Sequence, residues 1–269
     1  MVKPRPNLLT KLTYAAGLGD RSERELYRLW RLKRFVPGRT DVLGTPVEFP
    51  DARSFLYMHD EIFRREIYRF QASGPSPLFI DGGANIGLAT LYVKRLYPAA
   101  RVVAFEPDEK IKAYLDRNIA AAGLSDVRTE ALALWSSATT LRFASEGADA
   151  GRVLRDERDR SEVAGRCEVR TARLRDYLGE PVDLLKLDIE GAELEVVRDC
   201  ADLLGNVRCL FVEYHSFASR PQGLADLLGM IERAGFRHHL SAPLVSDAPF
   251  WERTEHLGMD NQLNVFAYR

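Results

Sequence analysis

The sequence predicts an α/β domain with a mostly parallel sheet of seven strands, preceded by an N-terminal helical extension. From Leu78 onward, short apolar segments typical of strands alternate with longer segments of helical periodicity. Such alternation implies a parallel sheet with helices on both faces. The 269 residues, 46% of them hydrophobic, suffice for one such domain with an appendage but are few for two enzymatic domains.

The extension is assigned to residues 1–76 and the sheet domain to residues 77–269, because Ser73-Gly74-Pro75 is a strong helix stop. Ser22 and Glu25 resemble a capping box, and the apolar residues that follow up to Val36 recur at helical spacing. A short strand is expected at 47–49 and a second helix over about 60–70, with Asp60 as its cap. We expect the extension to act as a cap on the acceptor side.

The basic charge of the chain is concentrated at its start. Residues 1–39 contain ten Lys or Arg against three acids. Two interpretations stay open: a helix that packs on the catalytic domain with solvated arginines, or attraction to an anionic glycan, lipid surface or partner.

The sheet domain is expected to alternate strands and helices in chain order. The predicted strands are 78–80, 102–105, 127–134, 184–187, 209–212, 236–240 and 264–268, and the predicted helices are 88–96, 111–122, 192–203 and 224–234. The stretch from Ser145 to Arg166 interrupts this order with mixed charges, and we interpret it as a surface loop or lid.

Composition restricts the compartment and the partners. A net charge of -1 gives no electrostatic reason to expect nucleic acid. The three cysteines lack metal-site spacing, no apolar run is long enough to span a membrane, and the start of the chain lacks a signal-peptide core. We therefore expect a cytoplasmic protein without an integral membrane segment, and a homo-oligomer is possible.

The loop from Asp81 to Gly87 follows the first predicted strand and precedes a helix, where open α/β sheets bind their ligands. Gly83 and Gly87 allow close approach of the backbone, and Asn85 tolerates a left-handed conformation. The spacing does not match the G-x-G-x-x-G fingerprint, which disfavours nicotinamide and flavin. An acid-led polar loop instead suits a zwitterionic ligand whose ammonium group lies near Asp81.

Two further acidic segments fall at the same predicted edge. Glu106 follows the second strand, about twenty residues after the loop, where a carboxylate can accept both hydroxyls of an adenosine ribose. Asp188 and Glu190 follow the buried strand that ends at Leu187, and a helix comes next.

These segments resemble the FkbM family of methyltransferases. The resemblance is carried by Phe79-Ile80-Asp81-Gly82-Gly83-Ala84-Asn85-Ile86-Gly87 and by Leu185-Lys186-Leu187-Asp188-Ile189-Glu190-Gly191-Ala192-Glu193. Phe105-Glu106-Pro107 and Leu210-Phe211-Val212-Glu213-Tyr214-His215 extend it, so that it covers roughly residues 78–216.

The resemblance implies a class I methyltransferase fold, which is Rossmann-like, with S-adenosylmethionine as methyl donor and a hydroxyl of a sugar, glycan or natural product as acceptor. The expected cofactor-binding residues are Asp81, Gly82, Gly83, Ala84, Asn85, Gly87, Glu106 and Asp188. One departure is Trp135, where the family often has a small or polar residue. Its indole either stacks on the ligand or packs in the core.

Methyl transfer to a neutral alcohol needs alignment and help in removing a proton. The candidates for that task are Asp188, Glu190, Glu213 and His215, and which of them takes the proton stays open. Asp188, Glu190 and Glu213 are alternatively ligands for a magnesium-like ion, although no metal is predicted. Glu193 is expected to stabilise the dipole of its own helix.

The acceptor is expected to be recognised by residues 1–76 and by the loop 145–166. Two alternative functions stay open: methylation of a nitrogen or protein acceptor, and a noncatalytic cofactor-binding scaffold. The scaffold is disfavoured because a decayed site has no reason to retain Asp81, Glu106, Asp188 and Glu190 together.

Overall fold

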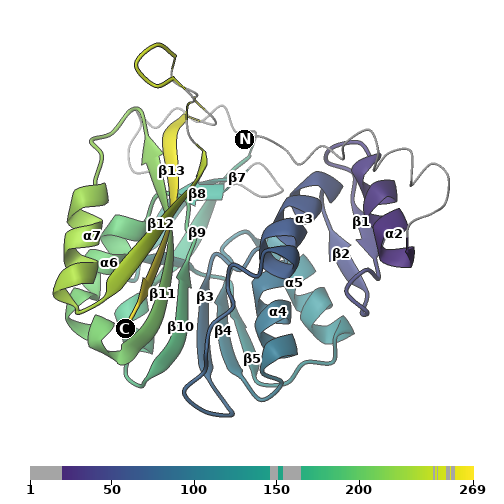
Figure 1. Ribbon diagram of the computed structural model, residues 1–269, viewed down its shortest axis with the longest axis horizontal. Helices are drawn as coiled ribbons and strands as arrows, with labels where there is room; N and C mark the ends of the chain where they lie inside the picture. Colours follow the sequence, from purple (N-terminus) through teal and green to yellow (C-terminus); the bar gives the residue numbers. More distant parts are fainter. Residues whose placement is uncertain are drawn as a thin grey trace.

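A computed structural model describes residues 20–145, 151–153, 165–244, 246, 248–252, 255 and 258–269. Its central sheet has seven strands in the order β12-β13-β11-β10-β3-β4-β5 (Figure 1). All neighbouring strands are parallel except at β13, which runs antiparallel to both β11 and β12. The predicted α/β class with a mostly parallel seven-stranded sheet is confirmed. The strands are β3 (Leu78–Gly82), β4 (Arg101–Phe105), β5 (Val127–Glu130), β10 (Val182–Leu187), β11 (Val207–Phe217), β12 (Arg237–Leu244) and β13 (Met259–Tyr268).

Helices cover both faces of this sheet. Helices α4 (Leu88–Leu96) and α5 (Glu109–Ala121) lie on one face, and α6 (Glu193–Asp199) and α7 (Leu224–Arg233) lie on the other (Figure 1). Side chains that are adjacent in a strand point to opposite faces, so Phe79 joins the hydrophobic cluster under α4 and α5 while Ile80 joins the cluster under α6 and α7. The central strands β3 and β10 are mostly apolar because both of their faces are buried.

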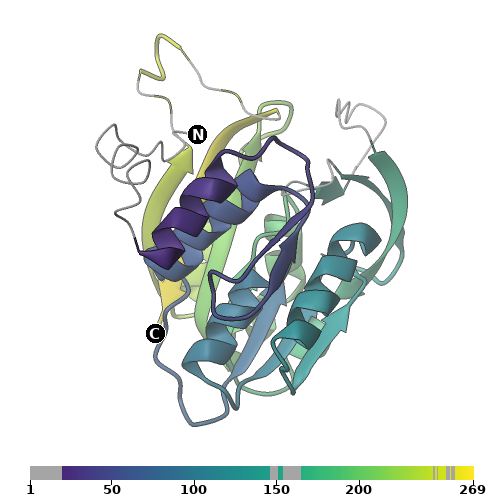
Figure 2. The same cartoon turned by 90° about the vertical axis from the view of Figure 1, so that its right-hand side faces the viewer.

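The N-terminal extension packs on the α4 and α5 face. It consists of α2 (Arg21–Trp30), the hairpin β1 (Gly38–Thr40) and β2 (Val47–Phe49), α3 (Ala52–His59) and a π-helical turn (Asp60–Arg64) (Figure 2). Leu29, Phe49 and Phe55 are fully buried in one cluster with residues of α4 and α5. The extension therefore shares a hydrophobic core with the sheet domain.

Local capping chemistry corrects two predictions in the extension. The capping box at Ser22 and Glu25 is wrong, because Asp20 caps α2 and Glu23 completes the box. This helix ends at Trp30 rather than near Val36, and Phe35 adopts a left-handed φ of 58°.

The second predicted helix, over 60–70, begins too late. The carboxylate of Asp51 accepts hydrogen bonds from the backbone N–H groups of Arg53 and Ser54 and starts α3 there. Asp60 does not cap a helix; it pairs with Arg64 and Arg65 inside the π-helical turn.

A second, four-stranded sheet was not predicted. Its order is β6-β9-β7-β8, formed by β6 (Ala133–Trp135), β7 (Thr140–Ser145), β8 (Gly151–Val153) and β9 (Gly165–Arg173). The single strand predicted over 127–134 is therefore wrong, because the chain leaves the central sheet after Glu130 and enters the second sheet at Ala133. Its small core of Ala133, Phe143 and Val169 offers a weak hydrophobic signal among charged residues.

Two other predictions concern the limits of elements. Residues 146–150 and 154–164, most of the predicted loop or lid, lie outside the described residues. The helix predicted over 192–203 ends at Asp199 and is followed by a 3-10 helix, Ala201–Asn206.

None of the helices in the described part of the chain has the length and apolarity needed to cross a membrane.

Candidate active site

The loop after β3 is built on left-handed backbone conformations. Gly83 and Gly87 have φ of 77° and 90°, and Asn85 has φ of 50°. The N–H groups of Gly83 and Ala84 both donate to the carbonyl oxygen of Phe105, at 3.1 and 2.8 Å. A Cβ atom on Gly83 would lie 1.8 Å from the backbone oxygen of Asp188, so only glycine fits where the loop after β3 passes the residue that follows β10.

Glu106 lies directly against this loop. Its Oε2 accepts the N–H of Asn85 at 3.0 Å, and its Oε1 accepts the N–H of Asp108 at 2.9 Å. The side chain is buried, and burial raises the pKa of Glu106 to about 7 although the Asp108 N–H favours the ionised form. The carboxylate is therefore held at the tip of β4 with a second lone pair on each oxygen.

Asp81 is fully buried beneath the loop. Thr90 donates its hydroxyl to Oδ2 at 3.0 Å, and the ammonium group of Lys186 lies 3.3 Å from Oδ1. Burial raises the pKa of Asp81 in spite of Lys186. The ammonium group next to this carboxylate thus belongs to the protein itself.

Lys186 lies in the candidate site and was not among the residues predicted from the sequence. Its Nζ donates to the carbonyl oxygens of Gly83 at 2.8 Å and Gly82 at 3.2 Å, and lies 3.5 Å from Oδ2 of Asp188. A lysine inside the apolar strand Val182–Leu187 was the available signal, since unpaired charges are rarely buried in a sheet.

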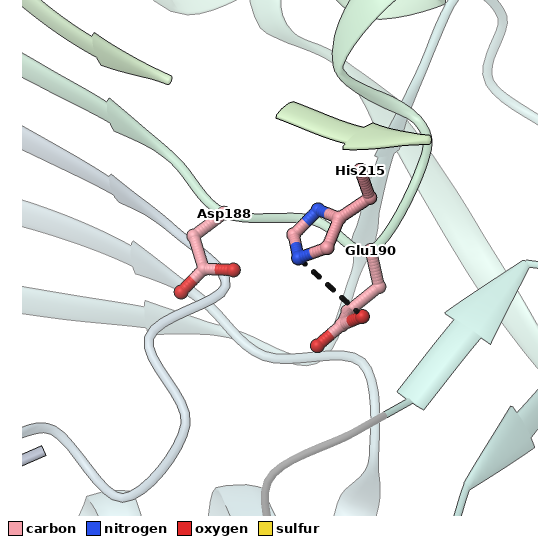
Figure 3. A group of neighbouring side chains, drawn as sticks. All are labelled: Asp188, Glu190 and His215. Atoms are coloured by element: carbon pink, nitrogen blue, oxygen red, sulfur yellow. Dashed lines mark ion pairs between the residues drawn. The ribbon is translucent and has the colours of Figure 1, made fainter. Parts of the chain in front are cut away.

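Asp188, Glu190 and His215 converge at the carboxyl edge of the sheet (Figure 3). The first two follow β10, and His215 lies on β11. Glu190 has a left-handed φ of 55° and Gly191 one of 95°, so the chain turns sharply where Glu190 comes within 3.7 Å of His215 Nε2. The structure brings together three of the four predicted catalytic residues in this cluster.

His215 is oriented by Glu193. Its Nδ1 lies 2.9 Å from Glu193 Oε1, and the same oxygen accepts the N–H groups of Ile189 and Gly191. Burial lowers the pKa of His215, but the carboxylates of Glu190 and Glu193 outweigh burial and raise it well above its usual value. Glu193 lies in the first turn of α6, as expected for a residue that stabilises the helix dipole, and its buried carboxylate also contacts the preceding loop and the histidine.

The fourth predicted catalytic residue, Glu213, lies two residues before His215 on β11. Gln262 of β13 donates its side-chain N–H to Glu213 Oε1. Burial, together with the charge of Asp188, raises the pKa of Glu213 well above its usual value.

The extension also reaches the site. Tyr57 and Glu61 form a hydrogen bond with each other, and both interact electrostatically with Asp188. Burial raises the pKa of Glu61 to about 7. Nothing in the sequence marked these two residues, since they belong to a segment whose helix was misplaced.

Two other side chains pack among apolar or aromatic neighbours, and one of them is Trp135, for which stacking on the ligand or packing in the core was expected. Trp135 packs against the hydrophobic cluster of the central sheet and against the small core of the second sheet. His59 stacks between Phe55 and Phe63, at centroid distances of 5.9 and 5.7 Å.

The family model described as the methyltransferase FkbM domain matches residues 81–238. The chain is 34% identical over 176 residues to methyltransferase sdnD of Sordaria araneosa, covering 53% of this chain and 67% of that protein. It is 33% identical over 228 residues to the AMB antimetabolite synthetase AmbE of Pseudomonas aeruginosa, covering 67% of this chain and 10% of the synthetase. It is 26% identical over 157 residues to the 2-O-methyltransferase NoeI of Sinorhizobium fredii, covering 52% of this chain and 64% of that protein.

Proposed function

Because the chain belongs to the FkbM family of methyltransferases, we propose that it transfers a methyl group from S-adenosylmethionine to a hydroxyl of a sugar, glycan or natural product. The family match spans more than half of the chain and includes both the loop after β3 and the segment after β10. The seven-stranded sheet, with β13 as its one reversed strand, is that of the class I methyltransferase fold.

The observation that carries this proposal is the placement of Gly83, Glu106 and Asp188 at one edge of the sheet. The backbone of Gly83 passes next to Asp188, and Asn85 in the same loop donates to Glu106. This edge is where open α/β sheets bind their ligands.

The residues present fit S-adenosylmethionine. Both oxygens of Glu106 keep a lone pair for the two ribose hydroxyls, and a carboxylate-rich edge suits a ligand that carries a sulfonium and an ammonium group. The remaining loop residues of the proposed cofactor site are Asp81, Gly82, Ala84 and Gly87. When bound, the cofactor supplies an electrophilic methyl group.

The acceptor side is proposed to be the cluster of Asp188, Glu190, Glu213 and His215. These side chains lie next to the proposed donor site, and Tyr57 and Glu61 of the extension face the same carboxylates. Their task is to orient the acceptor oxygen and accept its proton. O-methylation is supported by the name of the Sinorhizobium relative, a 2-O-methyltransferase.

The reaction is proposed to take place in the cytoplasm, where the thiols of Cys167, Cys200 and Cys209 would stay reduced. The alternative acceptors, a nitrogen atom or a protein side chain, differ from the proposed one in their products. Mass spectrometry of products from a panel of sugars, glycans, amines and peptides separates them.

Isothermal titration calorimetry with S-adenosylmethionine tests the donor site. We expect saturable binding by the wild-type protein, loss of binding in Gly83→Arg and Glu106→Ala, and no binding of NAD. Binding of NAD in place of S-adenosylmethionine would refute the proposal, and donor binding without methylation of any acceptor would favour a noncatalytic scaffold.

A further inference from the structure

The cluster of Asp188, Glu190 and His215 brings three side chains that can ligate a metal close together. One donor atom from each residue, two carboxylate oxygens and an imidazole nitrogen, can be chosen so that all three lie within 4.8 Å of one another. Donors around an octahedral cation at about 2.1 Å lie about 3.0 Å apart when adjacent and about 4.2 Å apart when opposite. The 3.7 Å between His215 Nε2 and Glu190 Oε2 already falls in that interval.

The contact of one ring nitrogen of His215, Nδ1, with Glu193 orients the ring for coordination through the other nitrogen, Nε2. Glu193 Oε1 contacts Nδ1 at 2.9 Å, which leaves Nε2 on the side of Asp188 and Glu190, where a cation would take the place of the Nε2 proton (Figure 3). A carboxylate that holds the remote nitrogen of a histidine is the usual outer-shell partner of a metal-bound imidazole. Glu193 is itself 1% exposed and anchored by two backbone N–H groups, so the orientation is rigid.

The charge around the cluster favours a cation. Glu213 and Glu61 place two further carboxyl groups near Asp188; burial raises the pKa of both, and a bound cation would favour their ionised forms. Lys186 lies 3.5 Å from Asp188, but its hydrogen bonds to Gly82 and Gly83 hold it beneath the donor loop. Glu190 is partly exposed, with 19% of its side chain accessible, so an ion has access to the cluster.

We infer that Asp188, Glu190 and His215 bind one divalent cation, and that this cation holds and activates the acceptor hydroxyl. An imidazole nitrogen with two carboxylates suits Mn²⁺, Fe²⁺ or Zn²⁺ better than Mg²⁺ or Ca²⁺, which prefer oxygen ligands. The role of the cation rests on the proposed function, whereas its binding does not.

The chemistry balances without any further reagent. As the acceptor oxygen forms its bond to the methyl carbon, the carbon–sulfur bond of the donor breaks and sulfur leaves as a neutral thioether. The hydroxyl proton passes to a neighbouring carboxylate such as Glu213. A cation bound to the hydroxyl lowers its pKa and fixes its direction.

Titration of the EDTA-treated, full-length protein with Mn²⁺, followed by electron paramagnetic resonance, tests the binding. We expect one saturable site per chain, at least tenfold weaker binding in Glu190→Gln and His215→Gln, and 10–100-fold weaker binding in Glu193→Gln. Glu195→Gln is the matched control, because this glutamate lies on α6 and pairs with Arg198. Its Mn²⁺ affinity should equal that of the wild type.

Several outcomes overturn the inference. They are the absence of a Mn²⁺ site in the wild-type protein, unchanged affinity in Glu190→Gln, and full methyl transfer in EDTA that is lost in His215→Gln. The last would make the Glu193–His215 pair a metal-free general base. If circular dichroism shows that His215→Gln does not fold, the Mn²⁺ affinity of Glu190→Gln decides, because Glu190 is partly exposed and its substitution should leave the fold intact.

Binding of S-adenosylhomocysteine in EDTA keeps the two proposals apart. Loss of cofactor binding with Mn²⁺ binding intact contradicts the proposed function alone, and the reverse contradicts the metal site alone.

Discussion

The ammonium group of Lys186 donates a 2.8 Å hydrogen bond to the carbonyl oxygen of Gly83 and so ties β10 to the loop that follows β3. The same nitrogen lies 3.3 Å from Asp81 and 3.5 Å from Asp188. Burial alone would lower the pKa of Lys186, but the charges of Asp188 and Asp81 outweigh it and raise the pKa. A buried cation therefore holds together the backbone and two of the carboxylates of the proposed donor site.

Replacing Lys186 with methionine should lower the free energy of unfolding by about 3–5 kcal/mol, because it leaves Asp81 and Asp188 as uncompensated charges. Urea denaturation measures the loss. Lys94→Met is the control: Lys94 is also buried and donates to a backbone carbonyl, that of Ala100, at 2.9 Å. Lys94→Met should lower the free energy of unfolding by less, about 1–3 kcal/mol. Equal losses would show that the carboxylates contribute nothing.

Substitution of Gly83 by alanine should disrupt the donor loop. The added Cβ would lie 1.8 Å from the oxygen of Asp188, whereas a Cβ on Gly123, which also has a positive φ, meets nothing within 4 Å. Gly123→Ala should therefore cost only the left-handed strain of about 1–2 kcal/mol. Gly83→Ala should cost more and abolish binding of S-adenosylmethionine in calorimetry. Wild-type affinity in Gly83→Ala would contradict the proposed loop.

Donor binding should weaken as pH falls through about 7. The free protein holds Glu106 with a pKa of about 7, and the ribose hydroxyls donate to the ionised form, so protons compete with the cofactor below that pH. The apparent Kd should rise by up to about tenfold per pH unit below the pKa. Calorimetry between about pH 5.5 and 8.5 checks this, because that range brackets the pKa of about 7 of Glu106.

Glu106→Gln should bind the donor weakly at every pH and flatten this dependence. Glu109→Gln, an exposed substitution in the first turn of α5, should keep the wild-type profile. A pH-dependent Kd that persists in Glu106→Gln would assign the titration to another group.

Asn118 should be a major contributor to stability. Its side-chain amide donates to the carbonyl oxygens of Glu48 and Ile86 and accepts the N–H of Glu48, joining α5 to the hairpin and to the donor loop. Asn118→Ala leaves several buried polar groups unsatisfied and should cost about 3 kcal/mol. Asn206→Ala removes one hydrogen bond, to Leu178, and should cost about 1 kcal/mol. Thermal unfolding compares the two variants.

Prediction from sequence worked best where the signal was local. The strands predicted at 78–80 and 184–187 and the helices predicted at 88–96 and 111–122 correspond to β3, β10, α4 and α5. The strands were recognisable because burial on both faces makes them apolar. It failed where the signal was weak, as in the second sheet, whose core contains only three buried apolar residues among those described. It also failed at the start of α3, because Asp51 and Asp60 are both suitable caps and only the structure shows that Asp51 is the one that caps the helix.

The sequence by itself determined the order of the strands and helices of the central sheet and the acids that follow β3, β4 and β10, because periodicity and turn chemistry are properties of neighbouring residues. Only the tertiary structure decided which of these groups meet. The pairing of Glu193 with His215, and the approach of Lys186 to Gly83, join residues 22 and 103 positions apart. Such contacts depend on strand register and on burial, which no local pattern contains.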